Sequence, residues 1–125
     1  MAETKIERMK RLFDTYGLTK EDYFKHKFYT IITRSGIDRI QASADIEINY
    51  ELLSPDINNV IIKAKAQMGD RYIETFGESN PKNTTNAYPI AMAEKRAMSR
   101  CVLKLTGFYE LGGFGEDEAD DFKRA

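Results

Sequence analysis

The sequence predicts an α+β domain in which an N-terminal helix and a short helix precede a three-stranded antiparallel β-meander, and a long C-terminal helix packs on the sheet. Two patterns lead to this fold class. Apolar residues alternate with polar ones through much of residues 45–76, which is typical of strands with one buried face. Near both ends of the chain they recur every three or four residues, which is the period of a helix. The 125 residues are enough for one domain that buries a core without metals or disulfides.

The N-terminal helix is expected to begin after Thr4, a good N-cap residue, and to run to about Tyr16, before Gly17. Glu7 lies three residues after Thr4 and completes a capping-box pattern. The apolar stripe of this helix consists of Ile6, Met9, Leu12 and Phe13. The short helix is expected over residues 37–44, after a β-rich stretch at residues 28–33, and its apolar side consists of Ile37, Ile40 and Ala44.

Three strands are expected to follow. Residues 45–53 and 60–68 alternate apolar with polar side chains, and Gly69-Asp70 suits a two-residue type II′ turn that returns residues 71–76 antiparallel to the second strand. The side chains expected on the buried face are Ile46, Ile48, Tyr50, Leu52, Val60, Ile62, Ala64, Ala66 and Met68. Those expected to face outward on the second strand are Lys63, Lys65 and Gln67.

The register of this hairpin brings cations and aromatic rings together on the outward face. A two-residue loop places Lys65 opposite Glu74, and it also pairs Gln67 with Tyr72 and Lys63 with Phe76. Lysines between aromatic rings suit a single strand of nucleic acid, because cations attract phosphates and flat rings stack on bases. The alternative is structural: Lys65 and Glu74 form a cross-strand ion pair, and another segment covers the rings.

The final helix, expected within residues 86–108, carries a row of like charges. Pro89 suits its first turn, and Gly107 is expected to end it. Arg96, Arg100 and Lys104 recur every four residues and so fall in one line. Like charges at this spacing each cost an isolated helix about 0.2–0.5 kcal/mol, which favours an anion at this row. The neighbouring arc, expected to be buried, consists of Ile90, Ala97, Met98, Cys101, Val102 and Leu105.

Charge is distributed unevenly along the chain. The net charge is −1, but residues 116–125 hold five acids and two bases, which leaves 17 bases and 15 acids in residues 1–115. The sequence therefore predicts one slightly basic domain, residues 1–115, whose GGFG segment at 112–115 connects it flexibly to an acidic tail, residues 116–125. The tail, which includes Phe122, has three open roles: solubility, competition with nucleic acid for the basic row, or docking to a partner protein.

Residue types that catalysis and metal binding need are sparse. The single cysteine excludes an internal disulfide, and Cys101 is expected in the core; one Cys and one His are too few for an ordinary zinc site. Asp120 and Asp121 lie in the flexible tail, which cannot hold the geometry of acid–base catalysis. We expect a protein that is not an enzyme and has no cofactor and no metal. The sequence shows neither a signal peptide nor a long apolar run, so we expect a cytoplasmic protein without membrane contact.

The order of these elements resembles the single-strand annealing proteins: the eukaryotic double-strand-break-repair annealer and phage relatives of the Erf and Sak types. These share a β-β-β-α core preceded by a short helix, and their core helix ends in a basic, alanine-rich segment that runs into a glycine. The matching residues here are AEKRAMSR at 93–100, LTGF at 105–108 and the acidic EDE at 116–118.

The resemblance implies a function and a set of contact residues. In that family, basic residues of the core helix, with one from the preceding short helix, line a groove that holds single-stranded DNA. The matching positions are Arg100 and Lys104, then Lys95 and Arg96, and Arg39 from the short helix. We expect a non-enzymatic protein that binds or anneals single-stranded DNA in phage or mobile-element recombination, as a ring or filament in the host cytoplasm. The alternative is an accessory protein that reuses this fold to bind protein or a small anion.

Overall fold

The computed structural model describes residues 3–26, 29–56, 58–84 and 87–116. In chain order these form α1 (Lys5–Tyr16), β1 (Tyr23–His26), β2 (Tyr29–Ile32), α2 (Arg34–Ala44), β3 (Glu47–Ser54), β4 (Val60–Met68), β5 (Arg71–Ser79), α3 (Pro89–Thr106), the 3-10 turn η1 (Tyr109–Leu111) and β6 (Gly113–Gly115). The α+β class is confirmed, and so is the meander with the long helix packed on it. Within the described ranges, no helix has the length and apolar character that a membrane span requires.

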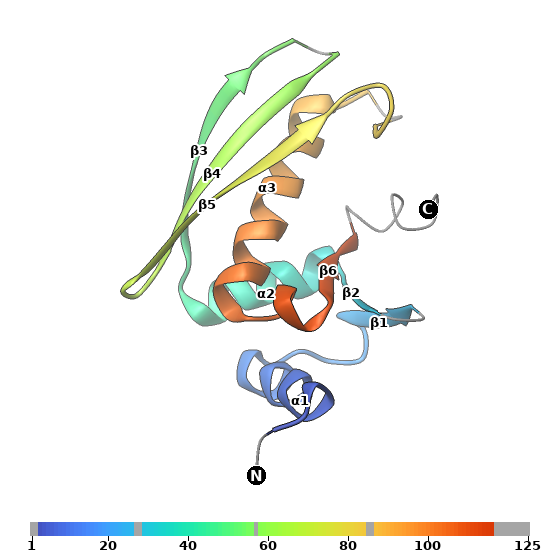
Figure 1. Ribbon diagram of the computed structural model, residues 1–125, viewed down its shortest axis with the longest axis vertical. Coiled ribbons are helices and arrows are strands. Elements are labelled where there is room, and N and C mark those ends of the chain that lie inside the picture. Colours follow the sequence, from blue (N-terminus) through green and yellow to red (C-terminus); the bar gives the residue numbers. More distant parts are fainter. Residues whose placement is uncertain (1–2, 27–28, 57, 85–86, 117–125) are drawn as a thin grey trace.

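The meander β3–β4–β5 is antiparallel, and α3 covers one of its faces. Figure 1 shows α3 running along this sheet, with α1 and the strands β1 and β2 beyond one end of it. The inner side chains of β4 are small or branched, which lets the helix approach closely. The core between sheet and helix consists of Val60, Ile62, Ala64, Ala66, Ala93, Ala97, Met98, Cys101, Val102 and Leu105.

Helix α3 and strand β5 are in close contact at Gly77. A Cβ atom at this position would overlap the backbone of α3 at Ala93 and Ala97, so only glycine fits. Two residues earlier on β5, the Thr75 hydroxyl donates a hydrogen bond of 2.7 Å to the carbonyl of Ala97. These contacts set how α3 lies on the sheet and therefore where its charged side chains emerge.

The predicted hairpin register is confirmed residue by residue. Met68 lies opposite Arg71, and the pairs Gln67–Tyr72, Lys65–Glu74 and Lys63–Phe76 follow. Gly69 has φ of 59°, whereas Asp70 is not in the left-handed region, which agrees with a type II′ turn.

Both helices near the N-terminus begin at threonine caps. The Thr4 side chain accepts a hydrogen bond of 3.1 Å from the Glu7 N–H, and its hydroxyl donates to the Glu7 carboxylate at 2.9 Å. Helix α2 begins at Arg34, three residues earlier than predicted, because Thr33 accepts from the N–H of Gly36 at 3.2 Å.

A second sheet, not predicted from the sequence, is formed by β1, β2 and β6. Strand β6 pairs in parallel with β2, so residues 113–115 form part of a sheet instead of a flexible connection. Two backbone hydrogen bonds hold this segment: Thr30 N–H donates to Gly112 O at 2.8 Å, and Gly113 N–H donates to Phe108 O at 2.9 Å. A strand of three residues is too short to show an alternating pattern.

Several residues expected on buried faces are exposed. Tyr50 and Leu52 point to the inner side of β3 but remain 41% and 47% exposed, because α3 packs mainly on β4 and β5 and covers little of this edge strand. Ile90 in the first turn of α3 and Ile6 on α1 are also exposed. The predicted patterns gave the correct face in β3 but not the extent to which α3 covers it.

Candidate nucleic-acid interface

The outer face of the meander presents two lysines beside two uncovered aromatic rings. Lys63 and Lys65 project from β4, and their neighbours on β5 are Phe76 and Tyr72, which are 47% and 56% exposed. Figure 1 shows α3 on the opposite face, and among the described residues no helix lies over this one. The alternative in which another segment covers the rings does not hold within the described residues.

The Glu74 carboxylate contacts two of the side chains on this face, Lys63 and Tyr72. The Lys63 ammonium lies 2.9 Å from its carboxylate, and the Tyr72 hydroxyl donates to it at 2.7 Å. The hydrogen bond from Lys63 is the main reason that the pKa of Glu74 is lowered and that of Lys63 raised. The Lys65–Glu74 ion pair of the structural alternative is replaced by this diagonal one, since Lys65 instead reaches Glu51 at 3.8 Å. Both lysines therefore have a carboxylate partner that partly neutralises them.

Lys63 also lies against the ring of Phe76, 5.9 Å from its centroid. Phe76 is 47% exposed beside this cation, so part of its ring surface is open to solvent. This arrangement can hold a phosphate near the lysines while a base stacks on Phe76 or Tyr72.

Arg96 is not part of an exposed row, which corrects the expectation that it contacts an anion from solvent. It is 3% exposed, and its guanidinium donates to the carbonyls of Glu78 and Asn83 at 2.9 and 2.6 Å. It also donates to the side chains of Asn83 and Thr84 at 3.1 and 2.9 Å. Arg96 thus holds the loop after β5 against α3, and its charge serves the fold.

Arg100 lies at the free edge of β5 with its side chain 18% exposed. Its guanidinium donates to the carbonyl of Phe76 at 2.6 Å and forms an ion pair of 3.1 Å with Glu78. A new anion at Arg100 would therefore compete with Glu78.

The other two basic candidates on α3 are exposed. Lys104 places its ammonium 4.9 Å from the centroid of the Tyr109 ring, and Lys95 projects from the surface of the helix. Both can take a phosphate without breaking an ion pair of the described residues.

Arg39 on α2 pairs with a buried acid. Its guanidinium lies 3.2 Å from the carboxylate of Asp22, which is almost fully buried whereas the arginine side chain is half exposed. Asp22 also accepts from the Thr19 N–H at 2.9 Å and the Ser35 hydroxyl at 3.0 Å, and these bonds, led by that from Thr19, lower its pKa. Arg39 therefore neutralises a buried charge in addition to any external role.

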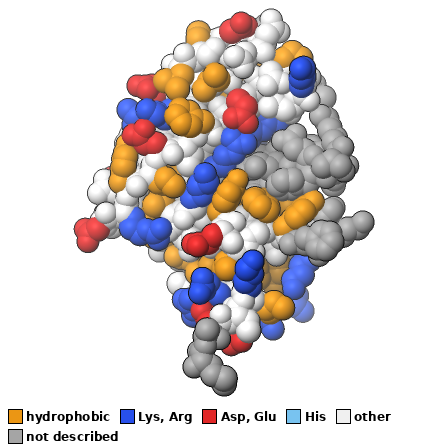
Figure 2. All heavy atoms as spheres, in the orientation of Figure 1, with side chains coloured by type: hydrophobic (Ala, Val, Ile, Leu, Met, Phe, Trp, Pro, Cys, Tyr) orange, Lys and Arg blue, Asp and Glu red, His pale blue; other side chains and the backbone are white. Residues whose placement is uncertain are grey.

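The candidates form two groups on opposite sides of the sheet. Lys63, Lys65 and Tyr72 lie on the outer face, whereas the arginines of α3 lie on the side that the helix covers. Phe76 connects them, because its ring contacts Lys63 and its carbonyl accepts from Arg100. Figure 2 shows Lys and Arg side chains interspersed with acidic and hydrophobic ones on the face in view. The predicted register already places Phe76 and Glu74 on the outer face, although Tyr72 is the only β5 residue among the predicted contact residues. Glu78 is not among the residues that the sequence singles out.

Comparison with known proteins adds no relative. No family model, no curated protein and no solved structure matches this chain. The resemblance to the annealing proteins therefore stays a prediction, and the evidence on function comes from the geometry of the outer face and the β5 edge.

Proposed function

We propose that this protein binds single-stranded DNA and acts, without catalysis, as a binding or annealing accessory in phage or mobile-element recombination. The observation that carries the proposal is the pair of exposed rings, Tyr72 and Phe76, beside Lys63 and Lys65 on an uncovered sheet face. Stacking on an aromatic side chain contributes about 1–3 kcal/mol per base, and only unpaired bases offer their faces to it.

The same face suggests a path for the strand. Phosphates approach Lys63 and Lys65 on β4, bases stack on Tyr72 and Phe76 of β5, and the strand continues over the β5 edge to Arg100. Lys104 and Lys95 on α3, both exposed, extend the positive surface beyond this edge. Glu74 and Glu78 act as internal anions that the DNA phosphates replace.

Assembly is part of this proposal. One chain presents only a few cations that a phosphate can reach, so useful affinity requires several subunits side by side along one strand, in a ring or a filament. Each bound phosphate releases counterions, so the affinity should fall steeply as salt rises.

The test is a fluorescence-anisotropy titration of labelled single-stranded and double-stranded oligonucleotides at two salt concentrations. We expect a preference for the single strand and a strong salt dependence. Tyr72→Ala should weaken single-strand binding by about tenfold, the equivalent of one stacked base. The matched control is Phe24→Ala, which removes an exposed ring of β1. Equal affinity for duplex DNA, or no binding to either at low salt, contradicts the proposal.

A second candidate function is a protein-interaction or small-anion-binding accessory. The exposed apolar residues Tyr50, Leu52 and Leu53 on the edge strand β3 favour its protein-interaction form. This function predicts no preference between single and double strands, so the same titration separates the two.

A further inference from the structure

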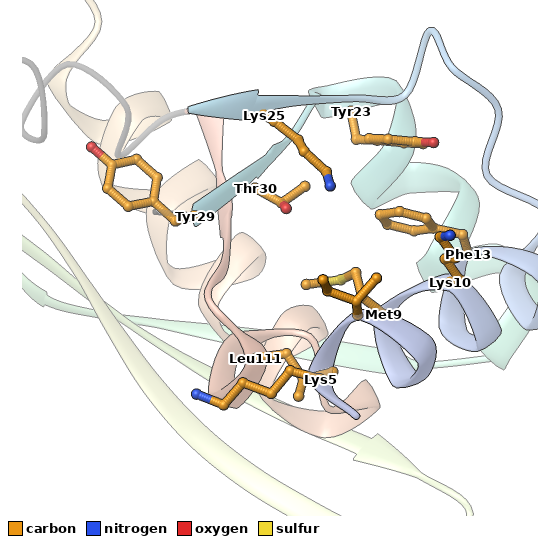
Figure 3. A pocket seen from close by; sticks show the side chains of 10 residues that line it. Lys5, Met9, Lys10, Phe13, Tyr23, Lys25, Tyr29, Thr30 and Leu111 are labelled. Atoms are coloured by element: carbon orange, nitrogen blue, oxygen red, sulfur yellow. The ribbon is translucent and has the colours of Figure 1, made fainter. Parts of the chain in front are cut away.

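A cavity of about 430 Å³ lies between α1 and the strands β1 and β2, away from the outer face of the meander. It has an apolar and aromatic wall, and its size falls in the range of pockets that take a small organic group. The residues that line it are Lys5, Ile6, Met9, Lys10, Phe13, Tyr23, Lys25, Tyr29, Thr30 and Leu111. Figure 3 shows the Lys25 side chain extending from β1 into the space between β2 and α1.

The charged residues of this lining are all lysines. Lys5 and Lys10 come from α1 and Lys25 from β1, and the lining contains no aspartate or glutamate. None of the three takes part in an ion pair among the described residues. An apolar hollow with three such cations matches a ligand that combines an aromatic group with several negative charges.

We propose that this cavity binds the chain's own acidic tail, residues 117–125, with Phe122 in the hollow and the preceding carboxylates on the lysines. The tail, DEADDFKRA, lies outside the described residues, and its sequence places four acids in the five positions before its phenylalanine. The basic row of α3 is a poorer match, because Arg96 and Arg100 of that row already hold the loop after β5 and Glu78.

Chain connectivity allows this docking within one molecule. Strand β6 pairs with β2, with Gly113 opposite Thr30 of the cavity lining and Gly115 opposite Ile32. The described chain ends at Glu116, whose carboxylate accepts from the N–H of Arg34 at 2.7 Å. Thr30 and Ile32 are about 7 Å apart along the strand. The six steps from Glu116 to Phe122 span up to about 20 Å when extended. The tail is therefore long enough to turn back to the cavity.

The test uses a chain that ends at Glu116 and a fluorescent peptide of residues 117–125. We expect saturable binding of the peptide to the shortened chain and at least tenfold weaker binding to the full chain. A tethered tail reaches an effective concentration in the millimolar range and so excludes the free peptide. Binding should weaken with salt, and a peptide with Phe122→Ala should bind at least tenfold more weakly.

Variants of the protein locate the binding site. Lys25→Glu and, separately, Lys10→Glu in the shortened chain should weaken peptide binding by about tenfold, and circular dichroism should show that the fold is retained. Lys104→Glu, an equal charge change on α3, should have no such effect. The proposal is overturned if no binding occurs up to millimolar peptide, if the full chain binds equally well, or if Lys104→Glu abolishes binding while Lys25→Glu does not.

Because none of these outcomes involves nucleic acid, the result is independent of the proposed DNA-binding function.

Discussion

At the scale of single residues, Arg96 shows that one line of basic side chains on a helix can contain both a buried cation that holds the fold and an exposed one. The sequence aligns Arg96 with Arg100 and Lys104, but exposure rises along the helix: Arg96 is buried, Arg100 is half-buried and Lys104 is exposed. Helical periodicity predicts the direction of a side chain. It does not predict that a loop such as residues 80–84 will fold over that side chain.

Arg96→Ala should destabilise the fold by about 2–4 kcal/mol, because it removes the hydrogen bonds by which a buried guanidinium holds residues 78, 83 and 84 against α3. Lys104→Ala is the matched control and should change the free energy of unfolding by less than about 0.5 kcal/mol. Urea denaturation followed by circular dichroism measures both. Equal stability of the two variants would show that the Arg96 hydrogen bonds contribute little.

Glu74 is the residue whose removal should strengthen DNA binding. Glu74→Gln removes the negative charge that holds Lys63 and the Tyr72 hydroxyl, so both become available to the strand. We expect about fivefold tighter single-strand binding at low salt, which corresponds to about 1 kcal/mol. Glu21→Gln changes the net charge equally at an exposed site before β1, outside the meander, and should have little effect. Unchanged binding by Glu74→Gln would place the strand elsewhere.

Cys101 should be chemically inert in the folded protein. It is fully buried, its thiol donates to the carbonyl of Met98 at 3.1 Å, and burial raises its pKa from 9.0 to about 11. At pH 8 a thiol reagent should modify Cys101 only after unfolding. The unfolded state loses this proton first, so the contribution to stability is complete below pH 9 and is lost as the pH rises toward about 11. Cys101→Ala should lose less stability over that interval. Rapid labelling of the native protein at pH 8 would contradict the expected inertness of the Cys101 thiol.

At the scale of elements, the meander was predictable and the small second sheet was not. Alternation over eight or nine residues determines both the face and the register of β4, and Gly69-Asp70 specifies the turn. Strands β1 and β6 have four and three residues, and β6 pairs with a strand some eighty positions earlier in the chain. Such pairing depends on tertiary contacts that local periodicity does not record.

The candidate site likewise has one part that the sequence predicts and one part that it does not. Hairpin register places Lys63, Lys65 and Tyr72 on one face from the sequence alone. The partners that alter each cation, such as Glu78 for Arg100 and Asp22 for Arg39, lie far away in sequence. Those ion pairs are consequences of the fold, and no spacing of residues predicted them.

The contact between α3 and β5 should be the least tolerant packing site. Gly77→Ala would place a methyl group against the helix backbone at Ala93 and Ala97, which cannot move without separating helix and sheet. We expect a loss of at least about 3 kcal/mol. Gly69→Ala, where no atom lies within 4 Å of the added group, should cost only the left-handed backbone strain of about 1–2 kcal/mol. Thermal unfolding compares the two, and a Gly77→Ala protein as stable as Gly69→Ala would show that the helix adapts.

At the scale of the whole molecule, the positive charge is distributed over two sides of one sheet and partly neutralised on both. Lys63 and Lys65 have glutamate partners on the outer face, and Arg100 has Glu78 at the β5 edge. A single chain therefore makes a weak electrostatic site. When several chains line up along one strand, the assembly contacts more of its phosphates than a single chain does. Nucleic-acid binding and assembly should therefore occur together.

Self-association should use the β3 edge. Strand β3 is an outer strand of its sheet, and Tyr50, Leu52 and Leu53 on it are between 41% and 47% exposed. An exposed apolar edge strand is a template for pairing with another chain. At the β5 edge, by contrast, Arg100 donates a hydrogen bond to the carbonyl of Phe76, so this acceptor is already used and less suited to pairing with another strand. In the pairing of β3 with β4 the register shifts between Leu52 and Ser54, so the regular part of β3 is residues 47–52 and Leu53 lies at the irregularity.

Light scattering after size-exclusion chromatography should therefore show oligomers of the wild-type chain at micromolar concentrations. The double change Leu52→Glu and Leu53→Glu should shift the protein to monomers and weaken single-strand binding, because isolated chains present few cations. Phe24→Glu, which adds charge at an exposed apolar site of β1, should leave the oligomers intact. Monomeric wild type with or without DNA would remove assembly from the mechanism. Oligomers that survive the double change would place the contact on another surface, such as α1. Because one chain contacts fewer phosphates than an oligomer, monomers of the double variant should also show a smaller salt dependence of binding.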